Sequence, residues 1–316
     1  MSTPDLSIVV VFFNMRREAQ RTLLALSRQY QRDVEDLDYE VICIDNGSSQ
    51  PLDETMVRSF GPEFRYHVFH TTSKSPAAAA NFGVAQARAR HVMVIIDGAH
   101  ILTPRVLAYA DIAIQSFENP LVAVQSLPLG GPTREEAENW EQAAEDQALA
   151  GIDWQRDGYE LFRVTHAYGD DARGWFGALF ESACITMRKD SFENLGGFDQ
   201  RFQSPGGGLV ALDLFQRALA RPEFAYIMLL GESTFHQFHG GAATGAKLDE
   251  HPWHTFHAEY RALRGHDFQR VARMPIYLGQ FMPQSLALAQ FSARQGFEFW
   301  RQQVQATSSL TLPPPG

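Results

Sequence analysis

The segment Leu6–Phe12 reads LSIVVVF, and it decides the fold expected for this chain. A continuous run of β-branched and aliphatic residues is typical of a strand buried on both faces of a parallel sheet. Two similar runs follow, EVICI at Glu40–Ile44 and HVMVII at His91–Ile96. Helical patterns separate them, the first with an apolar stripe of Ala19, Leu23, Leu26 and Tyr30. This alternation predicts an α/β fold with a mostly parallel central sheet flanked by helices.

Shorter patterns of both kinds continue along the chain. Small residues, helix-start signals and apolar runs mark them. The elements expected from these patterns are a strand at Tyr66–Phe69, helices at Ala77–Ala89 and from Thr103-Pro104, an acidic helix opened by a capping box at Thr133–Glu136 and reaching about Ala150, a strand at Leu179–Met187, a helix at Leu209–Ala220 and a strand at Phe224–Leu230.

The composition is that of an ordinary globular protein, with 316 residues, 45% of them hydrophobic. The net charge of −10 argues against a nucleic-acid binder, because phosphate contacts need a basic surface. Cys43 and Cys184 lie in apolar runs and are expected to be buried free thiols. Without a signal-peptide pattern or an apolar run of about 18 residues, we expect a cytoplasmic protein. Peripheral membrane contact and the oligomeric state stay open.

The stretch Asp97-Gly98-Ala99-His100 directly follows the run His91–Ile96. In an open α/β sheet, ligands bind at the carboxyl ends of the strands, so the carboxylate of Asp97 is placed at the expected ligand site. Asp45 ends the run at Glu40–Ile44 in the same way. The sequence therefore predicts a polar site at this edge of the sheet.

Several segments of the chain, taken in order, resemble the family 2 glycosyltransferases of the GT-A fold. The resemblance covers roughly residues 5–240, and it is specific because the segments occur together. They are SIVVVFFN (Ser7–Asn14), EVICIDNGSS (Glu40–Ser49), ANFG (Ala80–Gly83) with Ala87 and VIID (Val94–Asp97), RKDSFENLGGFDQRF (Arg188–Phe202) and DLFQR (Asp213–Arg217).

The resemblance implies a nucleotide-sugar donor, UDP-sugar above others, and a hydroxyl acceptor on a glycan or metabolite, with inversion. It implies a GT-A domain at 1–240, with a nucleotide-binding half (1–126) and an acceptor half (127–240). Residues 241–316 would form a helical extension with a disordered Pro-rich tail. The residues that match donor-binding positions are Phe13, Asn14, Arg16, Asp45, Asn81, Asp97 and Gly98. Asp45 has an alternative role, capping its own turn.

The metal site usual in this family is altered here. Ala99 stands where the second carboxylate of Asp-x-Asp is expected, and its side chain cannot coordinate a metal. The segment GESTFHQFHGG ends in His239-Gly240-Gly241, and the resemblance implies that Asp97 and His239 together hold Mg²⁺ or Mn²⁺. His236 in the same segment is a second candidate for a role at the diphosphate, through a metal or directly. An imidazole ligand favours Mn²⁺ over Mg²⁺. A packed core histidine or a phosphate-binding glycine loop stays open as an alternative.

The acceptor side is altered as well. Val210-Ala211 replace the Glu-Asp pair that supplies the base in the family. Asp213 and Glu181 remain as candidate bases to remove the acceptor proton, although Asp213 is alternatively a structural acid paired with Arg217. Trp175 and Phe176 are expected either to stack on an acceptor sugar or to pack in the core.

A rival interpretation is a non-catalytic module that binds a nucleotide sugar or glycan. A protein of this family that had lost its catalytic function would be expected to lose a metal-binding carboxylate and the usual base, and both are missing here. A dinucleotide oxidoreductase is set aside, because no G-x-G-x-x-G follows the first strand.

Overall fold

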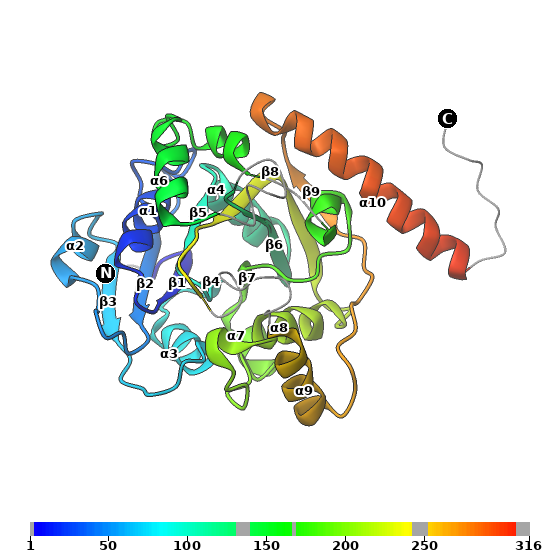
Figure 1. Ribbon diagram of the computed structural model, residues 1–316, viewed down its shortest axis with the longest axis horizontal. Coiled ribbons are helices and arrows are strands. Elements are labelled where there is room, and N and C mark those ends of the chain that lie inside the picture. Colours follow the sequence, from blue (N-terminus) through cyan, green and yellow to red (C-terminus); the bar gives the residue numbers. More distant parts are fainter. Residues whose placement is uncertain (1–2, 131–139, 166–168, 242–251, 308–316) are drawn as a thin grey trace.

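A computed structural model describes residues 3–130, 140–165, 169–241 and 252–307 (Figure 1). The capping box expected at Thr133–Glu136 and the Pro-rich tail at 312–316 lie outside these residues.

The described chain is built around one sheet of nine strands. The order is β3-β2-β1-β4-β7-β6-β8-β5, and β9 also pairs with β8. The strands are β1 (Leu6–Phe12), β2 (Tyr39–Asp45), β3 (Phe64–Val68), β4 (His91–Ile95), β5 (His100–Leu102), β6 (Pro120–Pro128), β7 (Cys184–Arg188), β8 (Ala225–His236) and β9 (Ile276–Gly279).

The amino-terminal part of the sheet is parallel, as the apolar runs predict. β1 pairs in parallel with β2 and β4, and β2 pairs in parallel with β3. Every residue of β1 and β2 is buried, which explains their lack of polar alternation. In register, Phe12 lies opposite Asp45, and Val10 lies opposite Ile95. The loops that follow β1, β2 and β4 therefore meet at one edge of the sheet.

Helices flank this sheet, which confirms the expected mostly parallel α/β architecture (Figure 1). α3 packs on β1 and β2, and α4 packs on β6 and β8. The described α-helices are α1 (Arg16–Leu26), α2 (Glu54–Arg58), α3 (Ala77–Gln86), α4 (Val106–Ser116), α6 (Gln142–Ala150), α7 (Lys189–Asn194), α8 (Val210–Leu219), α9 (Trp253–Arg264) and α10 (Leu286–Thr307).

The second half of the sheet is mixed. β7 runs antiparallel to β4 and β6, whereas β6 and β8 are parallel. The strand expected at Leu179–Met187 is shorter, because regular pairing begins only at Cys184. The strand expected at Phe224–Leu230 is longer, since β8 continues to His236 and pairs antiparallel with β5. This extension places His236 opposite His100 on β5.

The carboxyl-terminal part contains the expected helices, α9 and α10, and in addition the strand β9. β9 pairs in parallel with β8, so this part completes the same sheet. α10 lies on the outside of the molecule and packs against a 3₁₀ helix, η2 (Gly169–Phe176) (Figure 1). Within the described residues, no helix is both long enough and apolar enough to span a membrane.

Candidate active site

Asp97 lies in the turn that follows β4. Its Oδ1 accepts a hydrogen bond from the Ala99 N–H at 2.9 Å, which closes a local turn. Gly98 donates its N–H to the Val11 carbonyl at 2.7 Å. A Cβ at Gly98 would lie 2.3 Å from Cδ1 of Phe12, so the turn can approach β1 only with glycine there. The second oxygen of Asp97, Oδ2, is left to contact other groups.

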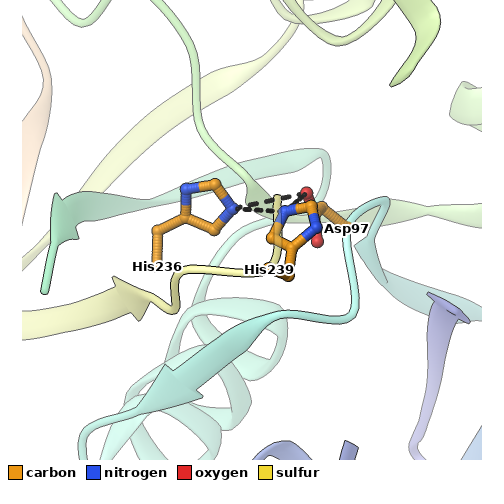
Figure 2. A group of neighbouring side chains, drawn as sticks. All are labelled: Asp97, His236 and His239. Carbon is orange, nitrogen blue, oxygen red and sulfur yellow. Dashed lines mark hydrogen bonds and ion pairs between the residues drawn. The ribbon is translucent and has the colours of Figure 1, made fainter. Parts of the chain in front are cut away.

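Two histidines from the segment at the end of β8 meet this carboxylate (Figure 2). Asp97 Oδ2 lies 3.4 Å from Nε2 of His236 and 3.3 Å from Nε2 of His239. The two Nε2 atoms are 3.2 Å apart. His100 on β5 stacks on His236, with ring centroids 4.6 Å apart and planes inclined by 13°. Residues far apart in sequence thus form one compact group.

The electrostatics of the group favour a charged carboxylate. Burial raises the pKa of Asp97, but the hydrogen bonds from His236 and His239 outweigh it and hold the pKa well below its ordinary value. Burial lowers the pKa of His239, and its contact with Asp97 reverses this, so the net pKa is raised. Burial lowers the pKa of His100 to about 3, so this ring stays neutral.

The three ligand atoms fit a divalent metal ion. Metal–ligand bonds of about 2.1 Å in tetrahedral or octahedral geometry place neighbouring ligand atoms roughly 3.0–3.4 Å apart. The observed separations among Asp97 Oδ2 and the two Nε2 atoms are 3.2, 3.3 and 3.4 Å. The resemblance points to His239 first and to His236 as a second candidate, and the structure brings both imidazoles to Asp97.

Gln237, between the two histidines, fixes their segment to the turn at Asp97. Its N–H donates to the Ala99 carbonyl at 2.8 Å, and its side-chain amide donates to the Glu18 carbonyl at 3.2 Å. Thr22 on α1 in turn donates its hydroxyl to the Gly98 carbonyl at 2.6 Å. The histidine segment, α1 and the Asp97 turn therefore form one hydrogen-bonded unit.

A cleft of about 360 Å³ opens beside this group. Asp97 and His239 line one side of it, and Phe13 and Asn14, which follow β1, line another. Asn14 adopts φ +55°, and its Oδ1 accepts hydrogen bonds from Ser49 and Gln50. These contacts join the loops after β1 and β2. The cleft therefore lies at the strand ends where the sequence predicts a ligand.

Comparisons with known proteins bear on this site. The model of glycosyl transferase family 2 matches residues 7–196, more than half of the chain. The chain belongs to this family. No curated protein sequence matches it.

Several solved structures share its fold. One is the crystal structure of S. aureus TarS 1–349, at 13% identity and a TM-score of 0.50 over 97% of this chain and 75% of that one. The complex of that protein with UDP-GlcNAc gives 13% identity and a TM-score of 0.51, over 95% of this chain and 73% of that one. The mannosyltransferase PcManGT from Pyrobaculum calidifontis, in complex with GDP-Man and Mn²⁺, has 15% identity and a TM-score of 0.46, over 98% of this chain and 77% of that one. The TarS structures confirm the expected GT-A fold.

Three residues at expected donor positions of this family 2 glycosyltransferase are otherwise engaged. Asp45 is fully buried and accepts backbone hydrogen bonds at 2.8 and 3.2 Å from residues that follow it, which is the turn-capping alternative. Asn81 bonds the backbone of Phe198 through both side-chain atoms and lies outside the lining of the cleft. Arg16 is exposed and donates Nε to the Pro51 carbonyl at 2.8 Å.

Asp213 is engaged in ion pairs with Arg217 and Arg264, an arrangement that matches the structural alternative stated for it above. Its carboxylate is fully buried and accepts hydrogen bonds at 2.6 and 2.7 Å from Arg264 and at 2.8 Å from Arg217. A carboxylate held by two guanidinium groups has few lone pairs left for an acceptor proton. Ala211, at the position where the family has an acid, lines the cleft.

Glu181 is an exposed residue just before β7, not inside a strand. Cys184 pairs with Ile95 at the last position of β4, and the two strands are antiparallel. The residues before Cys184 therefore reach the same end of β4 from which the chain continues to Asp97. Of the two acids expected to serve as base, Glu181 is the exposed one, and neither lines the cleft.

The aromatic pair expected to stack on an acceptor is packed elsewhere. Trp175 is fully buried, and its Nε1–H donates to the Glu232 carbonyl at 2.8 Å. Phe176 packs beside the rings of Phe281 and Phe297, beneath α10. The alternative of core packing is thus correct for Trp175, and its ring is unavailable to a sugar.

Proposed function

We propose that the protein transfers a sugar from a nucleoside-diphosphate sugar, with UDP-sugar as the favoured donor, to a hydroxyl group of a glycan or metabolite. The transfer would proceed with inversion, as in the relatives that the sequence resembles. The observation that carries the proposal is the group of Asp97, His236 and His239, of which Asp97 and His239 line a cleft at the strand ends. Phe13 and Asn14 would face the nucleotide, since both line this cleft.

Asp97, His236 and His239 would hold a divalent cation. Two imidazoles and one carboxylate suit Mn²⁺ better than Mg²⁺, which prefers oxygen ligands. When bound, the ion would neutralise the charge that develops on the diphosphate leaving group. Ala99 offers no ligand, so the second imidazole takes the place of a second carboxylate.

Glu181 would serve as the base that accepts the proton of the acceptor hydroxyl. Its exposed position at the Asp97 end of β4 supports this role, whereas the ion pairs of Asp213 argue against that residue. A positioned carboxylate contributes roughly a factor of 10² to 10⁴ to such a step.

A second candidate function is a binding module without transfer activity. Ala211 favours it, because an alanine lines the cleft where the resemblance implies the acid that removes the proton. Ala99 favours it also, since it removes a metal ligand.

The two candidates differ in turnover. The protein would be incubated with UDP- and GDP-sugars and a panel of glycan acceptors, with Mn²⁺ or with EDTA, and nucleoside diphosphate release would be measured. Acceptor-dependent release in Mn²⁺, lost in Asp97→Asn but kept in Asp190→Asn on α7, would support the transferase. Binding of a nucleotide sugar without release across the panel would support the binding module.

A further inference from the structure

We propose that Lys74 binds the diphosphate of the donor and supplies a positive charge that the altered metal site lacks. This inference rests on the proposed function and concerns the same cleft. Lys74 lies between β3 and α3, and the sequence patterns did not single it out.

The structure places Lys74 on the cleft wall. It lines the cleft together with Asp97 and His239, the two residues of the metal group that face the same space. Its carbonyl accepts a hydrogen bond from the Gly206 N–H at 3.1 Å. The neighbouring Ser73 hydroxyl donates to Oε1 of Gln203 at 3.1 Å. The backbone at Lys74 is therefore held by the adjacent loop that contains Gly206, which also lines the cleft.

The charge of Lys74 is not used within the described protein. No carboxylate pairs with its ammonium group among the residues that the structure describes, and Lys74 is the single lysine or arginine among those that line the cleft. The nearby arginines are occupied: Arg17 and Arg21 pair with acids of α6. Lys74 is exposed and lines the cleft, so its ammonium group is available to an anionic ligand.

The charge balance of the cleft points to a diphosphate. A nucleoside-diphosphate sugar brings roughly two negative charges, and a divalent ion held by Asp97 retains about one net positive charge. Lys74 supplies the remaining charge, and lysine commonly binds phosphate as a point charge. This arrangement also gives the diphosphate a partner that does not depend on the metal.

The test compares Lys74→Gln and Lys74→Arg with Lys189→Gln as the matched control. Lys189 bonds the Ala87 carbonyl and lies outside the lining of the cleft. Calorimetry would measure the affinity for UDP, GDP and uridine, in Mn²⁺ and in EDTA. Of UDP and GDP, the one that wild type binds more tightly should bind to Lys74→Gln at least tenfold more weakly, both in Mn²⁺ and in EDTA. The affinity for uridine should be unchanged. Lys74→Arg should stay within about threefold of wild type, since it keeps the charge.

Equal diphosphate affinity in Lys74→Gln and wild type would overturn the inference and leave the proposed function standing. A wild-type protein that binds neither diphosphate would overturn both. Protection mapping adds a measurement that needs no variant, because the chain has only three lysines, Lys74, Lys189 and Lys247. UDP or GDP should slow acetylation of Lys74 but not of Lys189, as followed by mass spectrometry. Unchanged acetylation of Lys74 at saturating nucleotide would overturn the inference.

Discussion

The carboxylate of Glu145 on α6 accepts a hydrogen bond from the N–H of Phe238 at 2.6 Å. Arg17 on α1 donates to the Phe238 carbonyl at 2.9 Å and pairs with Glu145 at 2.6 Å. Both backbone polar atoms of one residue, Phe238, are thus held by an ion pair that joins two helices. Glu145 is fully buried, and a buried, fully hydrogen-bonded network of this kind rigidifies the backbone that it holds. The pair positions the histidines without touching a ligand.

Glu145→Gln should weaken Mn²⁺ binding about tenfold, because outer partners of metal ligands typically contribute a factor of 10 to 100. The amide keeps the size of the side chain but places an N–H group toward Arg17 or Phe238. Electron paramagnetic resonance of free Mn²⁺ measures the affinity. Asp146→Asn is the control, since Asp146 contacts the same arginines but is not bonded to Phe238. Equal losses in the two variants would contradict a positioning role for Glu145.

Gly98→Ala should destabilise the protein by about 1–3 kcal/mol, the usual cost of forcing an extra carbon into a packed core. The added Cβ would lie 2.3 Å from the Phe12 ring and 2.8 Å from the Val11 carbonyl oxygen. Urea unfolding measures the effect. At Gly151, the nearest atom to a built Cβ is 3.4 Å away and φ is −80°, so Gly151→Ala should change stability by less than 0.5 kcal/mol. A tolerated Gly98→Ala would contradict the described turn.

Asp213→Asn should destabilise the protein by about 3–5 kcal/mol, because it leaves the buried ends of Arg217 and Arg264 without their partner. Urea unfolding would show the loss, and nucleotide affinity of the folded protein should stay within threefold of wild type. An unchanged unfolding midpoint with lost turnover would restore Asp213 as the catalytic base.

Glu181→Gln should lower activity and leave stability unchanged, unlike Asp213→Asn. Turnover should fall at least about 100-fold, since the amide cannot accept the acceptor proton. The unfolding midpoint and the affinity for nucleoside diphosphate should not change, because Glu181 is exposed. Steady-state kinetics with the best donor and acceptor provides the measurement, and full activity in this variant would remove Glu181 from the mechanism.

Glu232 makes the stability of the folded protein depend on pH. Burial raises the pKa of its carboxyl from 4.5 to about 7, against hydrogen bonds from Tyr159 and the Arg105 N–H that lower it. Between these values, the unfolded chain releases the proton while the folded protein keeps it, so stability falls as pH rises. The loss should begin above about pH 4.5, end near pH 8 and reach roughly 3 kcal/mol.

Urea midpoints of wild type and Glu232→Gln from pH 4.5 to 8 measure this effect, since other groups cancel in the difference. Wild type should lose stability relative to the variant as pH rises. A constant difference across that range would show that Glu232 does not titrate there.

The strands that the sequence predicts well are those buried on both faces. β1, β2 and β4 read as continuous apolar runs, so their type and order follow from residue composition. β5 and β9 have three and four residues, too short for a periodic signal. β6 was also missed, and its register shifts at a bulge between Ala123 and Gln125.

In the candidate site, too, some residues were predicted from the sequence and others were not. Asp97 and His239 were predicted because each follows a recognisable segment, and the structure brings them within 3.3 Å. The pairing of Asp213 with Arg217 was among the alternatives, whereas its second partner, Arg264, lies 51 residues away and was not predicted. His236 was the weaker candidate in the same segment, and its place beside Asp97 follows from the pairing of β8 with β5, which the sequence does not signal. The donor base, inversion, Mg²⁺ or Mn²⁺, and the cytoplasmic location stay predictions.

The central claim is that Asp97, His236 and His239 hold a divalent ion that binds the diphosphate of the donor. Its most direct test is calorimetric binding of UDP and GDP to wild type and Asp97→Asn, each in Mn²⁺, in Mg²⁺ and in EDTA. Mn²⁺ should strengthen diphosphate binding to wild type at least tenfold over EDTA, and more than Mg²⁺ does, with no such gain in the variant. Equal diphosphate affinity of wild type in Mn²⁺ and in EDTA would contradict the claim.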